Sequence, residues 1–300
     1  MAPAGASVKV TIGEHQLSLS NLAKVLYPAV GFTKAQVVDY YVRVAPALLT
    51  HLGDRGVTLR RYPDGVEGPS FFEKRCPGHR PSWIGAVLGP GDHNGAIGYC
   101  RLDSVAALAW AANMAALELH APMARADDIE SPTMVVFDLD PGAPAGIAEC
   151  ARVALEIADD LGALGLQLWP KTSGGKGLQL YLPLNTPCTH ERASAFAQAV
   201  AQLLERRRPK AVTSTMAKAA RTGKVFVDWS QNSRHKTTVC AYSLRAQPEP
   251  TVSTPVSWSE VAAAADGASL RFTADQVCAR LDELGDLFAP TAQLRQELPV

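Results

Sequence analysis

The chain has 300 residues, of which 47% are hydrophobic and 19% charged, and its formal net charge is zero. This composition is too apolar for a disordered chain, and the length allows one large or two small domains with a buried core. Neutrality excludes indiscriminate binding to nucleic acid but allows a local basic face, and no apolar run approaches the roughly 18 residues of a membrane span.

The N-terminus and the cysteines indicate the compartment. The first ten residues, MAPAGASVKV, lack the pattern of a signal peptide. Six cysteines occur without a Cys-x-x-Cys pair and predict reduced, mostly buried thiols. Cys76 and His79 resemble half of a zinc site, but no second pair follows at a suitable spacing. We therefore expect a cytoplasmic protein without a membrane anchor.

Local patterns predict a series of elements along the first half of the chain. These are a hairpin over residues 8–20, a helix over 33–49, strands within 56–65 and 69–75, and a buried helix over 104–120. Thr33 and Gln36 fit a capping box at the start of the first helix. If residues 69–75 form a strand, side-chain alternation predicts that one of Phe71 and Phe72 is buried and the other is free to stack on a base.

The second half mixes strands and helices in the same way. The predicted elements are a strand over residues 135–140, a helix over 147–164, strands within 167–184, an amphipathic helix over 191–208, strands over 225–230 and 236–244, and a helical tail from about 277. The regular βαβ rhythm of a dinucleotide fold is missing. The order therefore favours an α+β fold.

Two aspartates stand one residue apart in the segment VVFDLDPG, residues 135–142. The apolar residues before Asp138 predict a buried strand, which Pro141 and Gly142 end. Because strand side chains alternate, Asp138 and Asp140 project from one face, about 6–7 Å apart. Two ionised carboxylates that close are costly unless a cation neutralises them. The alternative is a solvated turn with two unrelated aspartates.

A later strand, VFVDWS, ends in a third aspartate, Asp228. If this carboxylate converges on the other two, the three form a pocket suited to hard divalent cations with oxygen ligands. Two ions about 3.5–4 Å apart can align an attacking hydroxyl with a phosphate. The alternative is a strand-end aspartate that caps a turn.

Glycines and cations suggest sites for anions. The segment SGGKG, residues 173–177, is flexible enough for backbone N–H groups to surround a phosphate, with Lys176 as counter-charge, although a plain glycine-rich turn is the alternative. Lys34 begins a predicted helix, where unpaired N–H groups favour an anion such as a terminal phosphate. Further cations gather in four places: Arg60-Arg61, Lys74-Arg75, residues 218–224 and residues 234–236.

Eight segments in one order resemble a known family. They are KVLYP, FFEK, ALELH, VVFDLDPG, TSGGKGLQLY, VTSTMAK, GKVFVDWSQN and YSLR. Together they resemble the polymerase domain of bacterial ligase D, the non-homologous end-joining enzyme, in the archaeo-eukaryotic primase superfamily. The resemblance covers residues 21–245 and implies a two-part α+β fold with mixed and antiparallel sheets flanked by helices and the active site between them.

The same resemblance implies a single primase-polymerase catalytic domain over residues 1–300, with a C-terminal helical extension over 246–300. No ligase or nuclease segment follows, so we expect a stand-alone mycobacterial-type relative or an excised domain. The implied activity is template-dependent primer extension in DNA repair, with a ribonucleotide preference, an NTP or dNTP substrate and two Mg²⁺ or Mn²⁺ ions. The implied partners are gapped or broken double-stranded DNA with a 5′-phosphate, a DNA ligase and Ku. The protein would be a monomer at the nucleoid.

The family's site residues carry over to matching positions. The implied catalytic metal ligands are Asp138, Asp140 and Asp228. The implied nucleotide-binding residues are Arg60, Arg61, His120, Ser173, Lys176, Gln179, Gln231 and Arg245. The implied DNA-binding residues are Lys24, Lys34, Phe71, Phe72, Lys74 and Arg221. In this scheme His120 and Ser173 lie near the sugar, and Lys24 and Lys34 grip the 5′-phosphate.

Two departures from the family pattern keep other functions open. Gln179 stands where the family usually has a histidine that contacts the triphosphate, and Arg60 stands where lysine is common. Because glutamine cannot become cationic, nucleotide affinity would be weaker, and a DNA-end-binding scaffold that has lost catalysis is the alternative. VVFDLDPG also resembles the first motif of haloacid-dehalogenase-type phosphatases, although Pro141 stands where glycine is usual.

Overall fold

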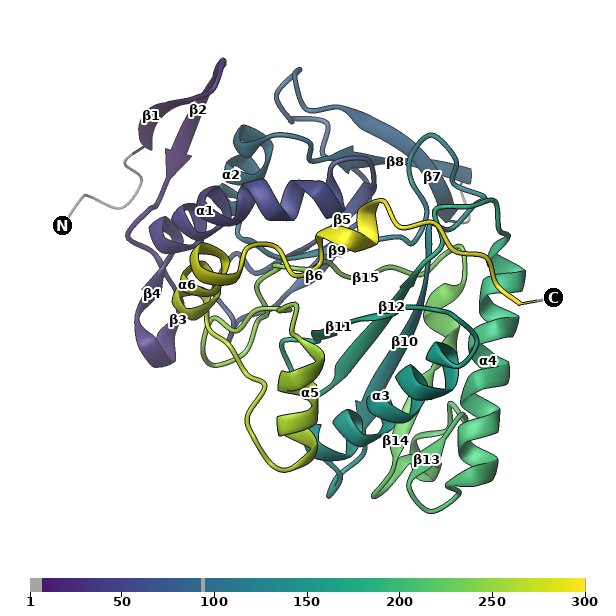
Figure 1. Cartoon of the computed structure of the whole chain (residues 1–300). Coiled ribbons are helices and arrows are strands. Elements are labelled where there is room, and N and C mark those ends of the chain that lie inside the picture. Colours follow the sequence, from purple (N-terminus) through teal and green to yellow (C-terminus); the bar gives the residue numbers. More distant parts are fainter. Residues whose placement is uncertain (1–6, 93–94, 300) are drawn as a thin grey trace. The chain divides into compact units, whose positions relative to one another are not determined.

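The computed structural model describes residues 7–92 and 95–299 and divides the chain into two compact units (Figure 1). Unit 1 takes in the chain up to Ala121, with Val239–Val252 and Phe272–Gly285. Unit 2 contains Pro122–Thr238, Ser253–Arg271 and the chain from Asp286 onward. The C-terminal region after residue 245 therefore contributes to both units.

Unit 1 is built on a six-stranded sheet in the order β15-β9-β5-β8-β7, with β6 paired to β5 off this path. The strands of this sheet are β5 (Gly56–Arg61), β6 (Phe71–Glu73), β7 (Ala86–Asp92), β8 (Gly95–Arg101), β9 (Ala116–Ala121) and β15 (Thr238–Val239). Its helices are α1 (Lys34–Leu52), α2 (Val105–Asn113) and α6 (Ala274–Leu284). The smaller elements are β1 (Ser7–Ile12), β2 (His15–Ser20), β3 (Val25–Tyr27), η1 (Pro28–Val30) and β4 (Phe32–Thr33).

The start of unit 1 follows the predicted pattern. β1 and β2 form the expected antiparallel hairpin, and Gly13 has a positive φ of 59° at its turn. Helix α1 begins with the predicted capping box, in which the Thr33 hydroxyl accepts from the Gln36 N–H and the Gln36 side chain accepts from the Thr33 N–H. The apolar face of α1 is buried, and the Tyr41 hydroxyl donates to the Leu117 carbonyl of β9 over 2.6 Å.

Unit 2 is built on a five-stranded sheet in the order β11-β12-β10-β14-β13. Its strands are β10 (Met134–Pro141), β11 (Trp169–Thr172), β12 (Leu178–Pro183), β13 (Val212–Thr213) and β14 (Val225–Asp228). Its helices are α3 (Ile147–Gly162), α4 (His190–Arg207), α5 (Trp258–Ala265), η2 (Lys218–Arg221), η3 (Trp229–Asn232) and η4 (Ala289–Ala292). All pairings are antiparallel except β13 with β14. Helices α3 and α4 both pack against the central strand β10.

Two of the expected elements are wrong in extent. The helix expected over 104–120 ends at Asn113, because the chain turns at Ala115, which has a positive φ of 56°, and continues as β9. The strand expected over 236–244 is limited to Thr238–Val239, since Tyr242 also has a positive φ, of 67°, and the backbone turns there.

The expectation that all six cysteines are reduced is also wrong. Cys76 and Cys100 form a disulfide with a Cα–Cα distance of 4.7 Å. The sequence separation of 24 residues is bridged because the Cys76 N–H donates to the Gly98 carbonyl of β8. The other four cysteines are free thiols: Cys150, Cys188, Cys240 and Cys278.

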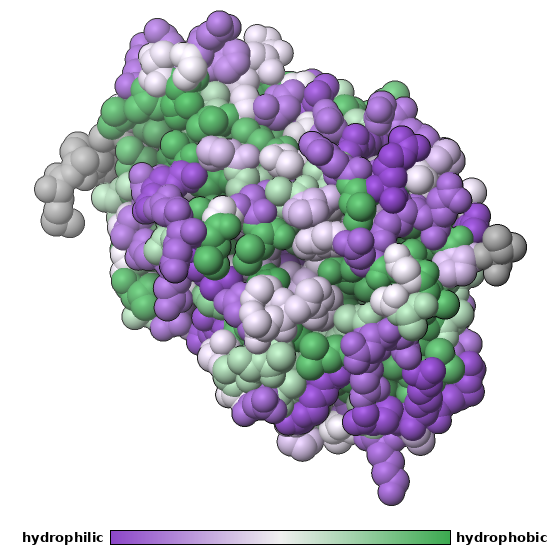
Figure 2. Space-filling model, viewed as in Figure 1, coloured by the Kyte–Doolittle hydropathy of each residue, from purple (hydrophilic) through white to green (hydrophobic). Residues whose placement is uncertain are grey.

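The surface agrees with the mixed composition. On the face drawn in Figure 2, hydrophilic and hydrophobic residues are interspersed. Within the described ranges, no helix combines the length and the apolar character needed to cross a bilayer.

Candidate active site and nucleic-acid interface

The three aspartates lie near the C-terminal ends of two neighbouring strands in unit 2. Asp138 and Asp140 lie two residues apart on β10, and the register of β10 with β14 places Asp228 directly opposite Asp138. Directly opposed residues in an antiparallel pair have Cβ atoms about 4.5–5.5 Å apart. Asp228 therefore lies across from Asp138 on the neighbouring strand, and Asp140 lies two residues further along β10.

This clustering disturbs the ionisation of Asp138. Burial, followed by the negative charge of Asp140, raises the pKa of Asp138 to about 7, and Asp228 adds to the rise. A hydrogen bond from the Gln179 side-chain amide to Asp138 Oδ1, 3.0 Å long, opposes it only in part. The protein's own cations therefore leave negative charge here uncompensated. Carboxylate oxygens are the donors that Mg²⁺ and Mn²⁺ prefer, so the donor set fits a hard divalent cation.

Asp228 also caps the turn that follows it. Its Oδ1 accepts from the N–H and hydroxyl of Ser230, and its Oδ2 accepts from the Gln231 side chain over 2.9 Å. Asp228 therefore caps the following turn and also lies opposite Asp138, so the two interpretations of this residue do not exclude each other. Among the described residues, no three His, Cys, Asp or Glu side chains are grouped closely enough to enclose a metal ion. Asp138 and Asp140 are the pair that best fits one.

Two glycines let backbone approach the aspartates. A Cβ on Gly177 would lie 2.4 Å from the Leu139 carbonyl oxygen and 3.5 Å from Asp140 Oδ1. A Cβ on Gly142 would lie 1.9 Å from the Arg221 carbonyl oxygen. Any side chain at either position would push a neighbouring loop away from the end of β10.

The SGGKG loop is closed on itself. Ser173 Oγ accepts from the N–H groups of Gly175 and Gly177, at 3.2 and 3.0 Å. The serine hydroxyl thus satisfies two N–H groups of the loop, and the expectation that the loop binds a phosphate stays a prediction. Lys176 projects from the exposed part of the loop.

Gln179 bridges a buried lysine and an aspartate. Its Oε1 accepts from Lys171 Nζ over 2.5 Å while its amide nitrogen donates to Asp138. Lys171 is 1% exposed and also donates to Ser253 Oγ over 2.6 Å. Sequence reasoning missed Lys171, because a lysine inside a strand pattern carries no signal of burial until its partners are known.

Asn232 is a second residue that the sequence did not single out. It is fully buried, accepts from the Val136 N–H, and donates to the carbonyls of Val136 and Trp229. Because β14 ends at Asp228, this side-chain amide takes the place of the next backbone pair along β10. It therefore fixes the turn that follows Asp228.

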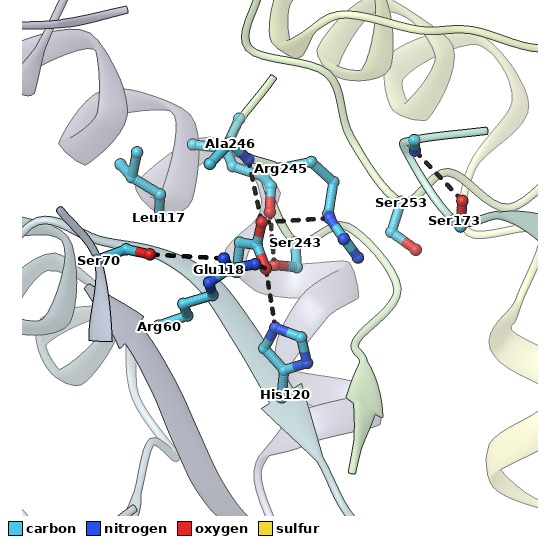
Figure 3. Close-up of polar contacts among 12 residues, drawn as sticks. Arg60, Ser70, Leu117, Glu118, His120, Ser173, Ser243, Arg245, Ala246 and Ser253 are labelled. Atoms are coloured by element: carbon cyan, nitrogen blue, oxygen red, sulfur yellow. Dashed lines mark hydrogen bonds and ion pairs between the residues drawn. The ribbon is translucent and has the colours of Figure 1, made fainter. Parts of the chain in front are cut away.

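Three predicted site residues of unit 1 surround another residue that the sequence did not single out, Glu118 (Figure 3). Its carboxylate is paired with His120 Nε2 at 3.0 Å, Arg60 Nη1 at 3.5 Å and Arg245 Nε at 3.4 Å. Arg61 lies apart from this cluster, because its side chain donates to the Met114 carbonyl and to Glu73.

Both Phe71 and Phe72 are exposed, by 45% and 55%, so the expectation that one is buried is wrong. β6 pairs with β5 off the main path of the sheet. Each phenylalanine ring is covered by an arginine guanidinium. Arg61 covers Phe71 at 5.2 Å, and Arg60 covers Phe72 at 5.1 Å. Two exposed aromatic rings backed by cations suit stacking on bases.

The expected phosphate-binding lysines lie in different surroundings. Lys34 is buried and donates to the Ser20 carbonyl over 2.9 Å. Burial, with the charges of Lys24 and Arg61, lowers its pKa to about 8, so this part of unit 1 is rich in positive charge. Lys24 is exposed and paired with Asp64 at 2.8 Å.

The remaining expected DNA-binding residues are Lys74 and Arg221. Lys74 is exposed in unit 1. Arg221 lies in η2 of unit 2, where its guanidinium covers the Phe226 ring at 3.8 Å and donates to the Met216 carbonyl. Its place beside β14 leaves a cation near the strand that carries Asp228.

Comparison with known proteins places this geometry in a family. The family model described as "LigD, primase-polymerase domain" matches residues 33–288. The multifunctional non-homologous end joining protein LigD of Mycolicibacterium smegmatis is 45% identical over 279 residues, which are 92% of this chain and 36% of that protein. The bifunctional LigD of Bacillus subtilis is 31% identical over 288 residues, which are 95% of this chain and 46% of that protein.

A solved structure shows the same fold. It is the polymerase domain from Mycobacterium tuberculosis ligase D in complex with DNA, with a TM-score of 0.87 and 42% identity over 92% of this chain and 98% of that one. The expected α+β fold, with mixed and antiparallel sheets flanked by helices, is confirmed. This chain spans less than half the length of the curated relatives named above. By its sequence and by its fold, the chain belongs to the LigD primase-polymerase domain family.

Proposed function

We propose that this chain is a metal-dependent nucleotidyltransferase that extends a primer 3′-hydroxyl on a template at DNA gaps or broken ends, with a preference for ribonucleotides. It would act in non-homologous end joining, the pathway that appears in the names of its relatives, with a DNA ligase and Ku as partners. The observation that carries the proposal is the register that places Asp228 opposite Asp138, beside Asp140. Membership of the primase-polymerase family leaves the phosphatase alternative without support.

The residues of unit 2 suit this chemistry by position and charge. Asp138 and Asp140 would hold divalent cations, and Asp228 would contribute from the facing strand. When bound, such ions would offset the negative charge of the triphosphate and lower the pKa of the attacking hydroxyl. Gln179 holds the Asp138 carboxylate by a hydrogen bond, and Lys176 provides an exposed cation beside the site for a phosphate. Catalysis would then consist of positioning and charge stabilisation.

The residues of unit 1 suit recognition of nucleotide and DNA. Arg60, His120 and Arg245 present donors and an imidazole around Glu118 for the incoming nucleotide. Phe71 and Phe72 would stack on template bases. Since these contacts involve ends, backbone and base faces and no base edges, binding would depend strongly on salt and weakly on sequence.

The test is primer extension with Mn²⁺ or Mg²⁺ and each NTP or dNTP. Asp138→Asn and Asp140→Asn should abolish extension while gapped DNA is still bound in a gel-shift assay. Asp159→Asn, which changes an exposed carboxylate on α3 of the same unit, is the matched control and should extend normally. Retained synthesis by either site variant would refute the metal-site assignment. DNA binding by the wild type without extension would favour the scaffold alternative.

A further inference from the structure

Glu118 joins several groups that the proposed function uses. Its side chain is 2% exposed, and each of its two carboxylate oxygens contacts a different set of groups. Oε1 accepts from the Ala246 N–H at 3.1 Å and from the Tyr62 hydroxyl at 3.3 Å, and it lies 3.4 Å from Arg245 Nε. Oε2 lies on the other side, 3.0 Å from His120 Nε2 and 3.5 Å from Arg60 Nη1 (Figure 3).

The carboxylate is ionised at neutral pH. Burial alone would raise the pKa of Glu118, but the hydrogen bond from His120 and the charge of Arg245 outweigh it and lower the pKa to about 2. An ionised carboxylate can only accept hydrogen bonds. The nitrogen that faces it, His120 Nε2, must therefore carry a hydrogen.

The other ring nitrogen of His120 is then left with a lone pair. Burial lowers the pKa of His120, and the charges of Arg245 and Arg60 add to this against the attraction of Glu118, so the imidazole is neutral. A neutral imidazole with hydrogen on Nε2 has an acceptor at Nδ1. Within the ranges that the structure describes, Nδ1 makes no hydrogen bond.

The surroundings of His120 suit an anionic ligand that brings a hydroxyl. The Nε atoms of Arg60 and Arg245 are buried without hydrogen bonds, and the terminal nitrogens of Arg245 bond to no residue that the structure describes. Phe72 meets the His120 ring edge to face at 5.5 Å. Two guanidinium groups attract phosphate, and the Nδ1 lone pair of His120 attracts a hydrogen-bond donor.

We propose that Glu118 is a positioning residue: by accepting the Nε2 hydrogen of His120, it presents Nδ1 as an acceptor for a sugar hydroxyl and so sets the preference for ribonucleotides. A deoxyribonucleotide lacks one hydroxyl donor and loses that bond. This inference rests on the ribonucleotide preference in the proposed function.

Glu118→Gln tests the role because the protein dictates how the new amide is oriented. The Ala246 N–H, Tyr62 and Arg245 all face one oxygen and require an acceptor there. The glutamine carbonyl would take that place, and its NH₂ group would face His120 Nε2. Nε2 must then become the acceptor, the hydrogen moves to Nδ1, and Nδ1 can no longer accept from a sugar hydroxyl.

The first measurement is the imidazole ¹H–¹⁵N long-range spectrum of the ligand-free protein, with His120 assigned by its loss in His120→Phe. We expect the Nε2–H tautomer in the wild type and the Nδ1–H tautomer in Glu118→Gln. The second measurement is kcat/KM for an NTP and for the matching dNTP. The NTP/dNTP ratio should fall about tenfold in Glu118→Gln, the value of one hydrogen bond.

Two controls separate this role from general support of the fold. Tyr62→Phe removes a donor to the other oxygen of Glu118 without touching His120, so tautomer and ratio should both stay as in the wild type. Glu118→Asp keeps an acceptor-only group and should retain the wild-type tautomer.

The outcomes distinguish the inference from the proposed function. An Nδ1–H tautomer or an imidazolium in the wild type overturns the inference whatever the activity, even if Glu118→Gln does not fold. An unchanged NTP/dNTP ratio in a folded Glu118→Gln also overturns it. If the wild type shows the expected tautomer but uses NTP and dNTP equally well, the proposed ribonucleotide preference fails, and the selectivity role of Glu118 fails with it.

Discussion

Replacing Asn232 by alanine removes a side chain that completes the central sheet of unit 2. Its amide exchanges two hydrogen bonds with Val136, each 2.8 Å long, and donates a third to the Trp229 carbonyl over 2.9 Å. Val136 is fully buried in β10, so alanine would leave its N–H and C=O without protein partners. At about 1–3 kcal/mol for each of these two unsatisfied buried groups, the expected loss is roughly 2–6 kcal/mol of unfolding free energy.

The loss can be measured by urea unfolding and located by amide hydrogen exchange. In Asn232→Ala the Val136 amide should exchange faster than in the wild type, and the unfolding midpoint should fall. Gln231→Ala is the matched control, since this neighbour in the same turn is only partly buried and donates one hydrogen bond, to Asp228. It should cost about 1 kcal/mol or less. Equal losses in the two variants, or unchanged exchange at Val136, would refute the reasoning.

Two further predictions concern the charged groups of unit 1. Lys34→Ala should remove the preference for a 5′-phosphorylated gap over an unphosphorylated one in binding assays. Lys9→Ala, at an exposed position on β1, should keep this preference. Equal weakening of binding to both substrates by Lys34→Ala would contradict a phosphate-binding role. Because the pKa of Glu118 falls from 4.5 to about 2 on folding, its ionised form stabilises the protein above pH 4.5, and this contribution is lost as pH falls toward 2. The pKa shift corresponds to about 3 kcal/mol. The unfolding free energy should therefore drop more steeply below pH 4.5 in the wild type than in Glu118→Gln. Parallel pH profiles of the two proteins would show that folding does not specifically stabilise the ionised carboxylate.

Elements with strong local signals were predictable from the sequence. The β1–β2 hairpin has alternating residues around Gly13, and α1 starts at a capping box whose two residues lie three positions apart. In these cases the groups that determine the structure are neighbours in the chain, so the printed order of residues already contains the interaction.

Elements whose form depends on distant partners were harder to predict. The run from Ser104 to His120 is largely apolar and predicts one continuous helix, so the turn at Ala115 and the start of β9 carry no clear local signal. The exposure of both Phe71 and Phe72 depends on how β6 is covered, which is a property of the sheet. The disulfide likewise depends on where β8 places Cys100.

The residues of the candidate site show the same difference between local signals and distant partners. The type and spacing of Asp138 and Asp140 suggested cation chemistry, and the β10–β14 register then placed Asp228 opposite the first of them. Glu118 and Asn232 gave no such signal, because their importance comes from partners that other segments deliver. A buried polar residue can be recognised as essential only when its hydrogen-bond partners are known.

The alternation of the chain between the two units limits how this protein can be shortened. Beyond Arg245, α5 packs on α3 in unit 2, whereas α6 packs on α1 in unit 1. A gene fragment that stops at Arg245 would strip one helix from each hydrophobic core and leave the former neighbours of Val261 and Val277, both fully buried in the intact chain, open to water. We therefore expect the chain truncated after Arg245 to be insoluble.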